Sequence, residues 1–336
     1  YLSMSNNSAV YSERPSMEVF MAEWLALVKS KSGERGIFNR QAALKHSPSR
    51  RKWGRHKPGC NPCAEILLRP YQFCNLSMAI ARADDTVESL KKKVRLAALF
   101  GKLQSLATDF NYIRPEWKKN CEEERLLGVD ITGQAECPLL QFGAPGRSEL
   151  LRELNKVVQE VDIKFSIRFG VNRSAANTTV KPGGDSAVFF HCGSGVTPWF
   201  SEHQWRWVRE PKETPVARFL VDSGVPYANA PEAPNEMFVF RFPKSAPKGA
   251  TLRNDMTALQ QFENWLDWKQ NWAEHSVSAT IYAEDHEWMA LGAKVYENFD
   301  HITGLSFLPK GRRKIAVTAN QSASPPTIAA SEKART

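Results

Sequence analysis

Apolar residues recur at helical spacing in several parts of the chain. Spacings of three and four residues place such positions on one face of a helix. The pattern predicts helices over residues 16–30, 86–110, 147–161, 256–274 and 285–299. Ser16 and Thr86 are typical N-caps for the first two. Trp265, Trp268 and Trp272 share one face of the fourth, which indicates a helix face in the core rather than a base-stacking platform.

Short runs rich in β-branched and aromatic residues lie between these helices. They predict strands at 126–133, 239–242 and 277–282. Residues 66–82 are consistent with a strand or an extended loop, whereas the polar and basic stretch 31–62 is typical of a loop. Helices that alternate with short strands favour the α/β class.

Composition limits the class of protein. The chain has 336 residues, of which 42% are hydrophobic and 24% charged, as in a soluble globular protein with a substantial core. It contains no apolar run of about eighteen residues, which predicts no membrane span. No signal peptide opens it, which predicts a cytoplasmic location. The first residue is Tyr1, so we expect the chain to begin inside a longer protein.

The net charge of +9 is a weak indication of a polyanionic partner. Part of the excess comes from residues 50–52 and 310–314, which are expected to be solvated loop positions. Residues 310–336 contain no aromatic residue and carry runs of small residues, so we expect a disordered tail there.

The cysteine pattern allows several kinds of chemistry. Six cysteines are too sparse for a secreted disulfide framework, and a reducing compartment with free thiols is expected. Cys60 and Cys63 form a Cys-x-x-Cys pair, and Cys74 is a third possible zinc ligand, with His46 and His56 as the local candidates for a fourth. A thioredoxin-type motif would need a helix start, where this stretch has Gly and Pro. The third interpretation is that these cysteines are ordinary buried residues without a redox or metal-binding role.

A fourth reading comes from Glu65, which lies between Cys63 and Cys74. Two thiols and a carboxylate form a set for redox chemistry and proton transfer. Residues 61–66 (NPCAEI) and 73–77 (FCNLS) resemble the active-site loop of ribonucleotide reductases, and their short separation is similar to the monomeric, adenosylcobalamin-dependent ribonucleoside-triphosphate reductases. Further stretches resemble the same family, and they follow one another in the order found in the family, from about residue 1 to 309. These stretches are residues 3–8, 32–40, 120–129, 179–182 and 296–300.

The resemblance implies a role for each residue of the loop. Cys63 would be the thiyl-radical site that takes the 3′ hydrogen of the ribose. Glu65 would accept the 3′-hydroxyl proton as general base, which helps the 2′-hydroxyl to leave as water. Cys74 would be one half of the reducing dithiol, and Asn61 would orient the ribose.

The fold implied is the C-terminal half of a ten-stranded α/β barrel over residues 1–309, with the Cys63 loop projecting inward. Implied partners are adenosylcobalamin, a ribonucleoside triphosphate and an external dithiol reductant such as thioredoxin. The family resemblance implies a monomer without direct contact to nucleic acid. The second dithiol cysteine lies upstream in the family, and its C-terminal cysteine pair has no counterpart after Cys192. The isolated chain is therefore expected to be inactive.

The family's substrate-phosphate loop resembles Pro-Ser-Gly-Thr, and the corresponding positions here are residues 182–186 (PGGDS). The resemblance implies phosphate binding by Lys181, Gly183, Gly184 and Ser186. Asp185 adds a carboxylate where an anion should bind. At about 4 Å, like charges repel by roughly 1 to 4 kcal/mol, depending on the local dielectric.

Two alternatives remain from the sequence. One is a non-catalytic remnant of a reductase, which Asp185 and the missing dithiol partner favour. The other is a basic zinc-dependent or nucleic-acid-binding module. The histidines at 191, 203, 275 and 286 show no metal-ligand spacing, so no metal site is assigned to them. Cys121, Cys137 and Cys192 are expected to be structural.

Overall fold

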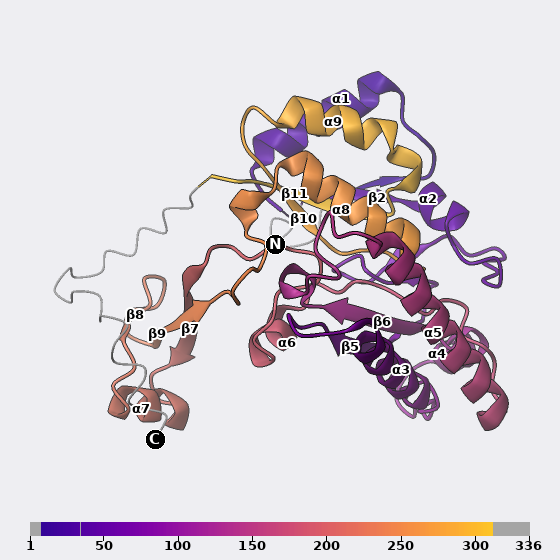
Figure 1. Cartoon of the computed structure of the whole chain (residues 1–336), viewed down its shortest axis with the longest axis horizontal. Helices are drawn as coiled ribbons and strands as arrows, with labels where there is room; N and C mark the ends of the chain where they lie inside the picture. The colour runs from indigo at the N-terminus through magenta and orange to yellow at the C-terminus, as the bar shows by residue number, and fades with distance from the viewer. Residues whose placement is uncertain (1–7, 34, 312–336) are drawn as a thin grey trace. The chain divides into compact units, whose positions relative to one another are not determined.

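The computed structural model describes residues 8–33 and 35–311 (Figure 1). The described chain divides into two compact units, a large one (8–202 and 246–311, without residue 34) and a small one (203–245). Most of the expected tail and residues 3–7 of the first resembling stretch lie outside the described residues. The expectation of one domain over 1–309 stays a prediction.

The large unit contains eight α-helices and eight strands within the described residues, some of them very short. The helices are α1 (Met17–Ser30), α2 (Arg40–Lys45), α3 (Val87–Gln104), α4 (Pro115–Glu124), α5 (Arg147–Phe169), α6 (Gly184–Phe189), α8 (Ala258–Asn271) and α9 (Trp288–Glu297). The strands are β1 (Ala9–Tyr11), β2 (Gly36–Asn39), β3 (Gly59–Cys60), β4 (Leu67–Leu68), β5 (Asn75–Ile80), β6 (Leu127–Thr132), β10 (Thr280–Ala283) and β11 (Gly304–Pro309).

The small unit is a three-stranded antiparallel sheet with one helix. Its elements are β7 (His203–Pro211), α7 (Pro215–Asp222), β8 (Tyr227–Asn229) and β9 (Met237–Ser245), and its strand order is β7-β9-β8. Phe240 of β9 is fully buried. The sequence predicted only 239–242 of this sheet.

The strands of the large unit form a four-stranded sheet in the order β1-β2-β11-β10 and a parallel pair β5-β6. β2 and β11 run antiparallel, whereas β1/β2 and β10/β11 are parallel. Single parallel bridges, Val129 to Thr178 and Val180 to Val277, connect β6 toward the start of β10. The mixed α/β class is confirmed, and the ten-stranded barrel stays a prediction.

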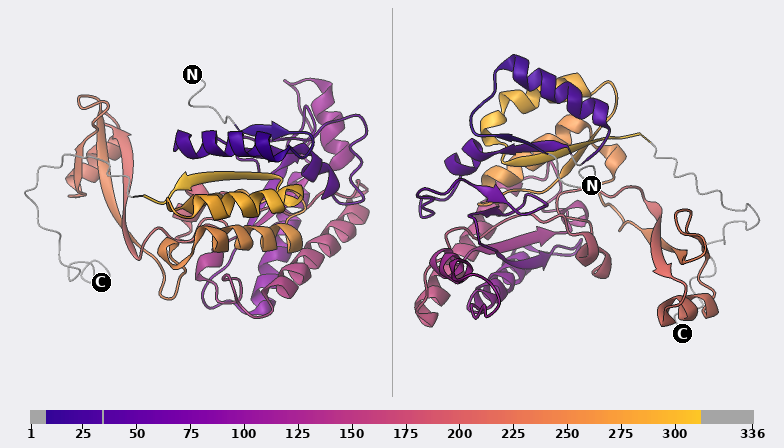
Figure 2. Two further views of the ribbon diagram at one scale, coloured as in Figure 1. Left: turned by 90° about the horizontal axis from the view of Figure 1, so that it is seen from above. Right: turned by 180° about the vertical axis from the view of Figure 1, so that it is seen from behind.

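Helices pack against the four-stranded sheet and against the β5-β6 pair (Figure 2). The alternate residues Leu127, Val129 and Ile131 of β6 belong to one core cluster with apolar residues of α3 and α5. The side chains between them therefore lie on the face turned away from these helices. Trp265 and Trp268 of α8, and Trp272 immediately after it, are at most 1% exposed, which confirms the predicted core face.

The long amphipathic helices begin where their caps predict. Ser16 accepts a hydrogen bond from the Val19 amide, and Thr86 forms a capping box with Ser89. α3 ends at Gln104 rather than 110, and α5 continues to Phe169 rather than ending at 161.

The predicted loop at 31–62 was wrong in part, because it contains β2, α2 and β3. These elements are too short to show a period, and distant contacts hold them. The Asn39 side chain caps α2 at Ala42 and donates to the Phe299 carbonyl at 2.9 Å.

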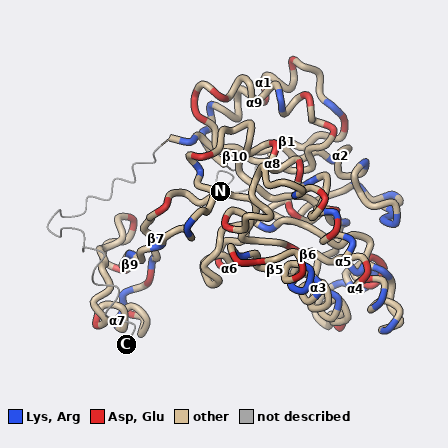
Figure 3. The backbone as a smooth tube through the Cα atoms, in the orientation of Figure 1, with Lys and Arg blue, Asp and Glu red and all other residues tan. Residues whose placement is uncertain are grey.

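The expectation of solvated charge at residues 50–52 was also wrong for Arg51, which is 4% exposed. Its guanidinium binds both carboxylate oxygens of Glu124, at 2.9 and 3.1 Å, and lies 3.8 Å from the ring centre of Trp53. Elsewhere, acidic and basic residues are interspersed along α4 and α5 (Figure 3). α3 differs, because it carries five basic residues and one acidic residue, Glu88.

Candidate active site

The candidate loop is the tip of a short hairpin between β3 and β4, in which Cys60 pairs with Leu67. Asn61 closes the tip. Its carbonyl accepts from the Ala64 amide at 2.9 Å, and its side-chain oxygen accepts from the Ile66 amide at 3.0 Å. Ala64 has a φ of 58°, a left-handed conformation that is costly for a residue with a Cβ atom. The hairpin therefore holds Cys63 in a tightly constrained turn.

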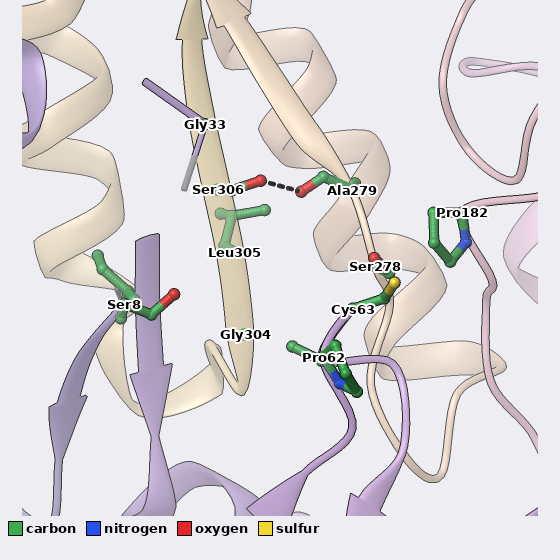
Figure 4. A pocket seen from close by; sticks show the side chains of 12 residues that line it. Ser8, Gly33, Pro62, Cys63, Pro182, Ser278, Ala279, Gly304, Leu305 and Ser306 are labelled. Carbon is green, nitrogen blue, oxygen red and sulfur yellow. Dashed lines mark hydrogen bonds between the residues drawn. The ribbon is translucent and has the colours of Figure 1, made fainter. Parts of the chain in front are cut away.

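Cys63 is exposed and lines a pocket of about 250 Å³ (Figure 4). The wall around it combines the hairpin tip with Pro182, Ser278 and the start of β11. Gly304 allows the close approach of β11, because a Cβ atom there would lie 3.1 Å from that of Ala64. Segments that are distant in sequence, including Ser8, Gly33 and Ile37, thus meet around this pocket.

Glu65 follows in the hairpin and is 3% exposed. Its carbonyl accepts from the Ser276 amide at 3.0 Å and from the Thr179 hydroxyl at 2.8 Å. Its carboxylate oxygen Oε2 is buried and has no hydrogen-bond partner among the described residues. A buried carboxylate with a free oxygen can accept a proton from a bound group.

The surroundings keep the nearby thiols protonated. Although Cys63 is exposed, partial loss of solvent in the pocket wall raises its pKa, the negative charge of Glu65 raises it further, and Lys181 opposes both. Burial and Glu65 also raise the pKa of Cys60 to about 11. Cys63 is therefore an S–H group at neutral pH, as hydrogen-atom exchange requires, and a poor thiolate nucleophile.

Cys74 lies immediately before β5 and does not line the Cys63 pocket. Its sulfur packs over Gly128 of β6, where a Cβ atom would lie 3.1 Å from Sγ. Burial raises its pKa strongly. None of the six cysteines, all of which the structure describes, forms a disulfide bond, and Cys121, Cys137 and Cys192 are buried.

None of the four predicted phosphate-binding residues lines the Cys63 pocket, although their neighbour Pro182 does. The Lys181 amide donates to Oδ1 of Asp130 at 3.0 Å, and Pro182 joins the wall beside Cys63. Gly183 is buried against Thr132. Gly184, Asp185 and Ser186 open the six-residue helix α6 and do not line the pocket.

The sequence alone pointed to no role for Asp130, and it assigned His275 no metal site. Nδ1 of His275 accepts from the Leu67 amide at 3.3 Å, and Nε2 faces the Leu127 carbonyl at 3.0 Å. These partners require a neutral ring with the proton on Nε2. Burial holds the pKa of His275 well below its ordinary value. His275 therefore ties the hairpin to β6.

Because His275 is buried as the neutral form, we expect the protein to lose stability in acid. Its folded-state pKa lies below its unfolded value, so the unfolded chain binds the proton first when the pH falls below about 6.5. The contribution of the neutral His275 to the free energy of unfolding is therefore complete above that pH. Below it, this contribution declines by up to about 1.4 kcal/mol per pH unit. Urea unfolding at pH 7.5, 6.5 and 5.5 should show a steeper decline for the wild type than for His275→Gln, whose amide can replace both bonds. Equal slopes would contradict the assignment.

Among the described residues, no three His, Cys, Asp or Glu side chains gather as a metal-binding group. Within the same residues, none of the helices combines the length and apolar character that crossing a bilayer requires.

No protein-family model matches the chain. Several curated proteins, however, are similar to it in sequence. The "Adenosylcobalamin-dependent ribonucleoside-triphosphate reductase" of Euglena gracilis is 24% identical over 256 residues, which cover 75% of this chain and 34% of the relative. The protein of the same name from Lactobacillus acidophilus is 24% identical, with 68% and 34% covered. The "Vitamin B12-dependent ribonucleoside-diphosphate reductase" of Mycobacterium tuberculosis is 28% identical over 42% of this chain and 24% of the relative.

Solved structures agree at the level of the fold. The crystal structure of a B12-dependent, class II ribonucleotide reductase matches with a TM-score of 0.73 and 19% identity, covering 98% of this chain and 49% of that one. The α subunit of the class Id ribonucleotide reductase from Actinobacillus ureae matches with a TM-score of 0.58 and 12% identity, covering 85% and 60%.

These matches confirm the resemblance seen in the sequence. The chain spans about a third of the length of the curated triphosphate reductases that it matches. Over this span it is similar in sequence to adenosylcobalamin-dependent ribonucleoside-triphosphate reductases, and in fold to a class II ribonucleotide reductase.

Proposed function

We propose that this chain supplies part of a catalytic site that reduces ribonucleotides to 2′-deoxyribonucleotides by thiyl-radical chemistry. The observation that carries the proposal is the hairpin tip, which places the protonated thiol of Cys63 in the wall of a pocket. Two residues later, Glu65 holds a buried carboxylate oxygen without a partner. One turn of the chain thus offers a thiol that can exchange a hydrogen atom and a carboxylate that can accept a proton.

In this proposal Cys63, as a thiyl radical, takes the 3′ hydrogen of the ribose and later returns a hydrogen. Glu65 accepts the 3′-hydroxyl proton while the 2′-hydroxyl leaves as water. Asn61 uses its side-chain oxygen to close the hairpin, so its amide nitrogen is the group left to bind a ribose hydroxyl.

The reduction also needs two electrons and two protons. A dithiol that closes to a disulfide supplies both, and Cys74 is the proposed half on this chain. The other half would come from the part of the reductase that this chain does not match. An external dithiol such as thioredoxin would then reopen the disulfide.

The proposed cofactor is adenosylcobalamin. When bound, it would supply the radical that removes hydrogen from the Cys63 thiol. The exposed position of Cys63 fits a radical source that approaches from outside the pocket.

The proposed substrate is a ribonucleoside triphosphate, with Lys181, Gly183, Gly184 and Ser186 as its phosphate-binding residues. Lys181 is half-buried and lies close enough to Cys63 to affect its pKa. Asp185 is exposed in this turn and opposes an anion. The site would act in a monomer in the cytoplasm.

A chimera tests the proposal. This chain replaces the matching segment of the Euglena gracilis reductase, and deoxynucleotide formation is measured with adenosylcobalamin, a dithiol and a ribonucleoside triphosphate. The parental reductase, cut and rejoined at the same boundaries, is the positive control. We expect cofactor-dependent product.

A chimera that folds but forms no product, while the control is active, would contradict the proposal that this chain is catalytically competent. That result would favour a non-catalytic remnant of a reductase, the second function that Asp185 supports. Restoration of activity by Asp185→Thr would then identify the phosphate turn as the lost part.

A further inference from the structure

The face of β6 turned away from the helices carries three residues in a row, Gly128, Asp130 and Thr132. Each lies against a different part of the candidate site. Gly128 meets the sulfur of Cys74, and Thr132 meets Gly183 of the predicted phosphate turn. Since a strand rises about 3.3 Å per residue, the row spans about 13 Å. Asp130 stands at its middle.

Asp130 is fully buried at this position, where a charged side chain is costly without partners. Oδ1 accepts from the Lys181 amide at 3.0 Å. Oδ2 is buried and has no hydrogen-bond partner among the described residues. Its neighbour across the strand pair is Met78, which offers no charge. The ionisable groups that act on Asp130 are Lys181 and Glu65.

We propose that Asp130 is a positioning residue of the candidate site, whose carboxyl group fixes the main chain at Lys181 and thereby sets the wall that Pro182 gives to the Cys63 pocket. This inference deepens the proposed function and rests on it. The hydrogen bond holds the chain at the point where the bridge between Val180 and Val277 ends and the turn begins. Without it, the Lys181 amide would lose its buried acceptor.

The oxygen Oδ2, which has no hydrogen-bond partner among the described residues, also allows Asp130 to hold a proton. Burial raises the pKa of Asp130 to about 7, the Lys181 amide and charge lower it, and the negative charge of Glu65 raises it. Neutralising Glu65 should therefore favour ionisation of Asp130. Near neutral pH the site can hold one proton on Asp130 while Oδ1 still accepts from Lys181.

Two variants of similar size separate the positioning role from simple packing. Asp130→Asn keeps an oxygen for the Lys181 amide, whereas Asp130→Val removes it. In the full chain, we expect hydrogen exchange of the Lys181 amide to accelerate at least tenfold in Asp130→Val and to stay within threefold of wild type in Asp130→Asn. The Leu127 amide, which binds the Ala176 carbonyl, serves as the reference for global opening.

Equal protection of Lys181 in wild type and Asp130→Val would overturn the proposal. So would parallel acceleration of Lys181 and Leu127 in both variants, because that indicates general destabilisation.

A second readout applies if Asp130→Val does not fold. With carboxyl-¹³C aspartate, one resonance should titrate with a midpoint near 7, disappear in Asp130→Asn and move to lower pH in Glu65→Gln. A midpoint that Glu65→Gln leaves unchanged would overturn the coupling. Neither measurement uses a nucleotide or cobalamin. An inactive chimera with these results intact would therefore count against the proposed function alone.

Discussion

Replacing Cys63 by serine is expected to abolish deoxynucleotide formation in the chimeric reductase. We expect a loss of at least about a thousandfold, equivalent to about 4 kcal/mol of activation free energy. The reason is the bond that exchanges hydrogen. An S–H bond is close in strength to a ribose C–H bond, whereas the O–H bond of serine is much stronger. Serine would also preserve the size of the side chain in the pocket wall.

Cys60→Ser is the matched control, because Cys60 lies on β3 of the same hairpin but does not line the pocket. It should retain most of the activity. Both variants should bind the ribonucleotide as the parent chimera does, since the loss is expected in turnover rather than binding. Turnover in Cys63→Ser comparable with that of Cys60→Ser would contradict the assignment of the radical site.

Removing the buried cation between α3 and α5 is expected to have the largest effect on stability. Lys102 and Asp162 have fully buried side chains, and Nζ lies 2.9 Å from Oδ1. Burial lowers the pKa of Lys102, and Asp162 opposes this. Lys102→Met would leave Asp162 without its main partner in the core. We expect the free energy of unfolding to fall by about 3 to 5 kcal/mol, as measured by urea denaturation.

An exposed pair between the same two helices provides the control. Lys91 of α3 lies 3.2 Å from Glu153 of α5, and Glu153 is 52% exposed. Lys91→Met should leave the urea midpoint unchanged. The double variant Lys102→Met/Asp162→Asn should recover part of the loss, because asparagine can still accept from the Ser174 amide that Asp162 binds. A double variant less stable than Lys102→Met would contradict this account.

Long, capped helices were the predictable part of the fold. Ser16 and Thr86 mark helix starts that the structure confirms, and the buried tryptophans in α8 and at its C-cap required only helical periodicity. β2 and α2 were missed because four to six residues carry no readable period. Their stability comes from contacts such as that of Asn39 with Phe299, which sequence alone does not indicate.

The candidate site shows the same division. Local resemblance pointed to the hairpin residues Cys63 and Glu65, because they lie close together in sequence. It did not point to Asp130, whose one visible signal is a carboxylate inside an apolar run. Its partner Lys181 is 51 residues away, and a strand bridge brings the two together. The left-handed turn at Ala64 had no glycine to mark it.

The strand order of the four-stranded sheet also determines when the sheet can form during synthesis. β11, the last described strand, lies between β2 and β10 and pairs Gly304 with Phe38. β1 and β2 therefore leave the ribosome long before their central neighbour exists. Pairings between residues so distant in sequence form slowly, and they leave apolar strand surface open in the meantime. Until β11 has been synthesised, the nascent chain thus lacks the strand that joins the two halves of this sheet.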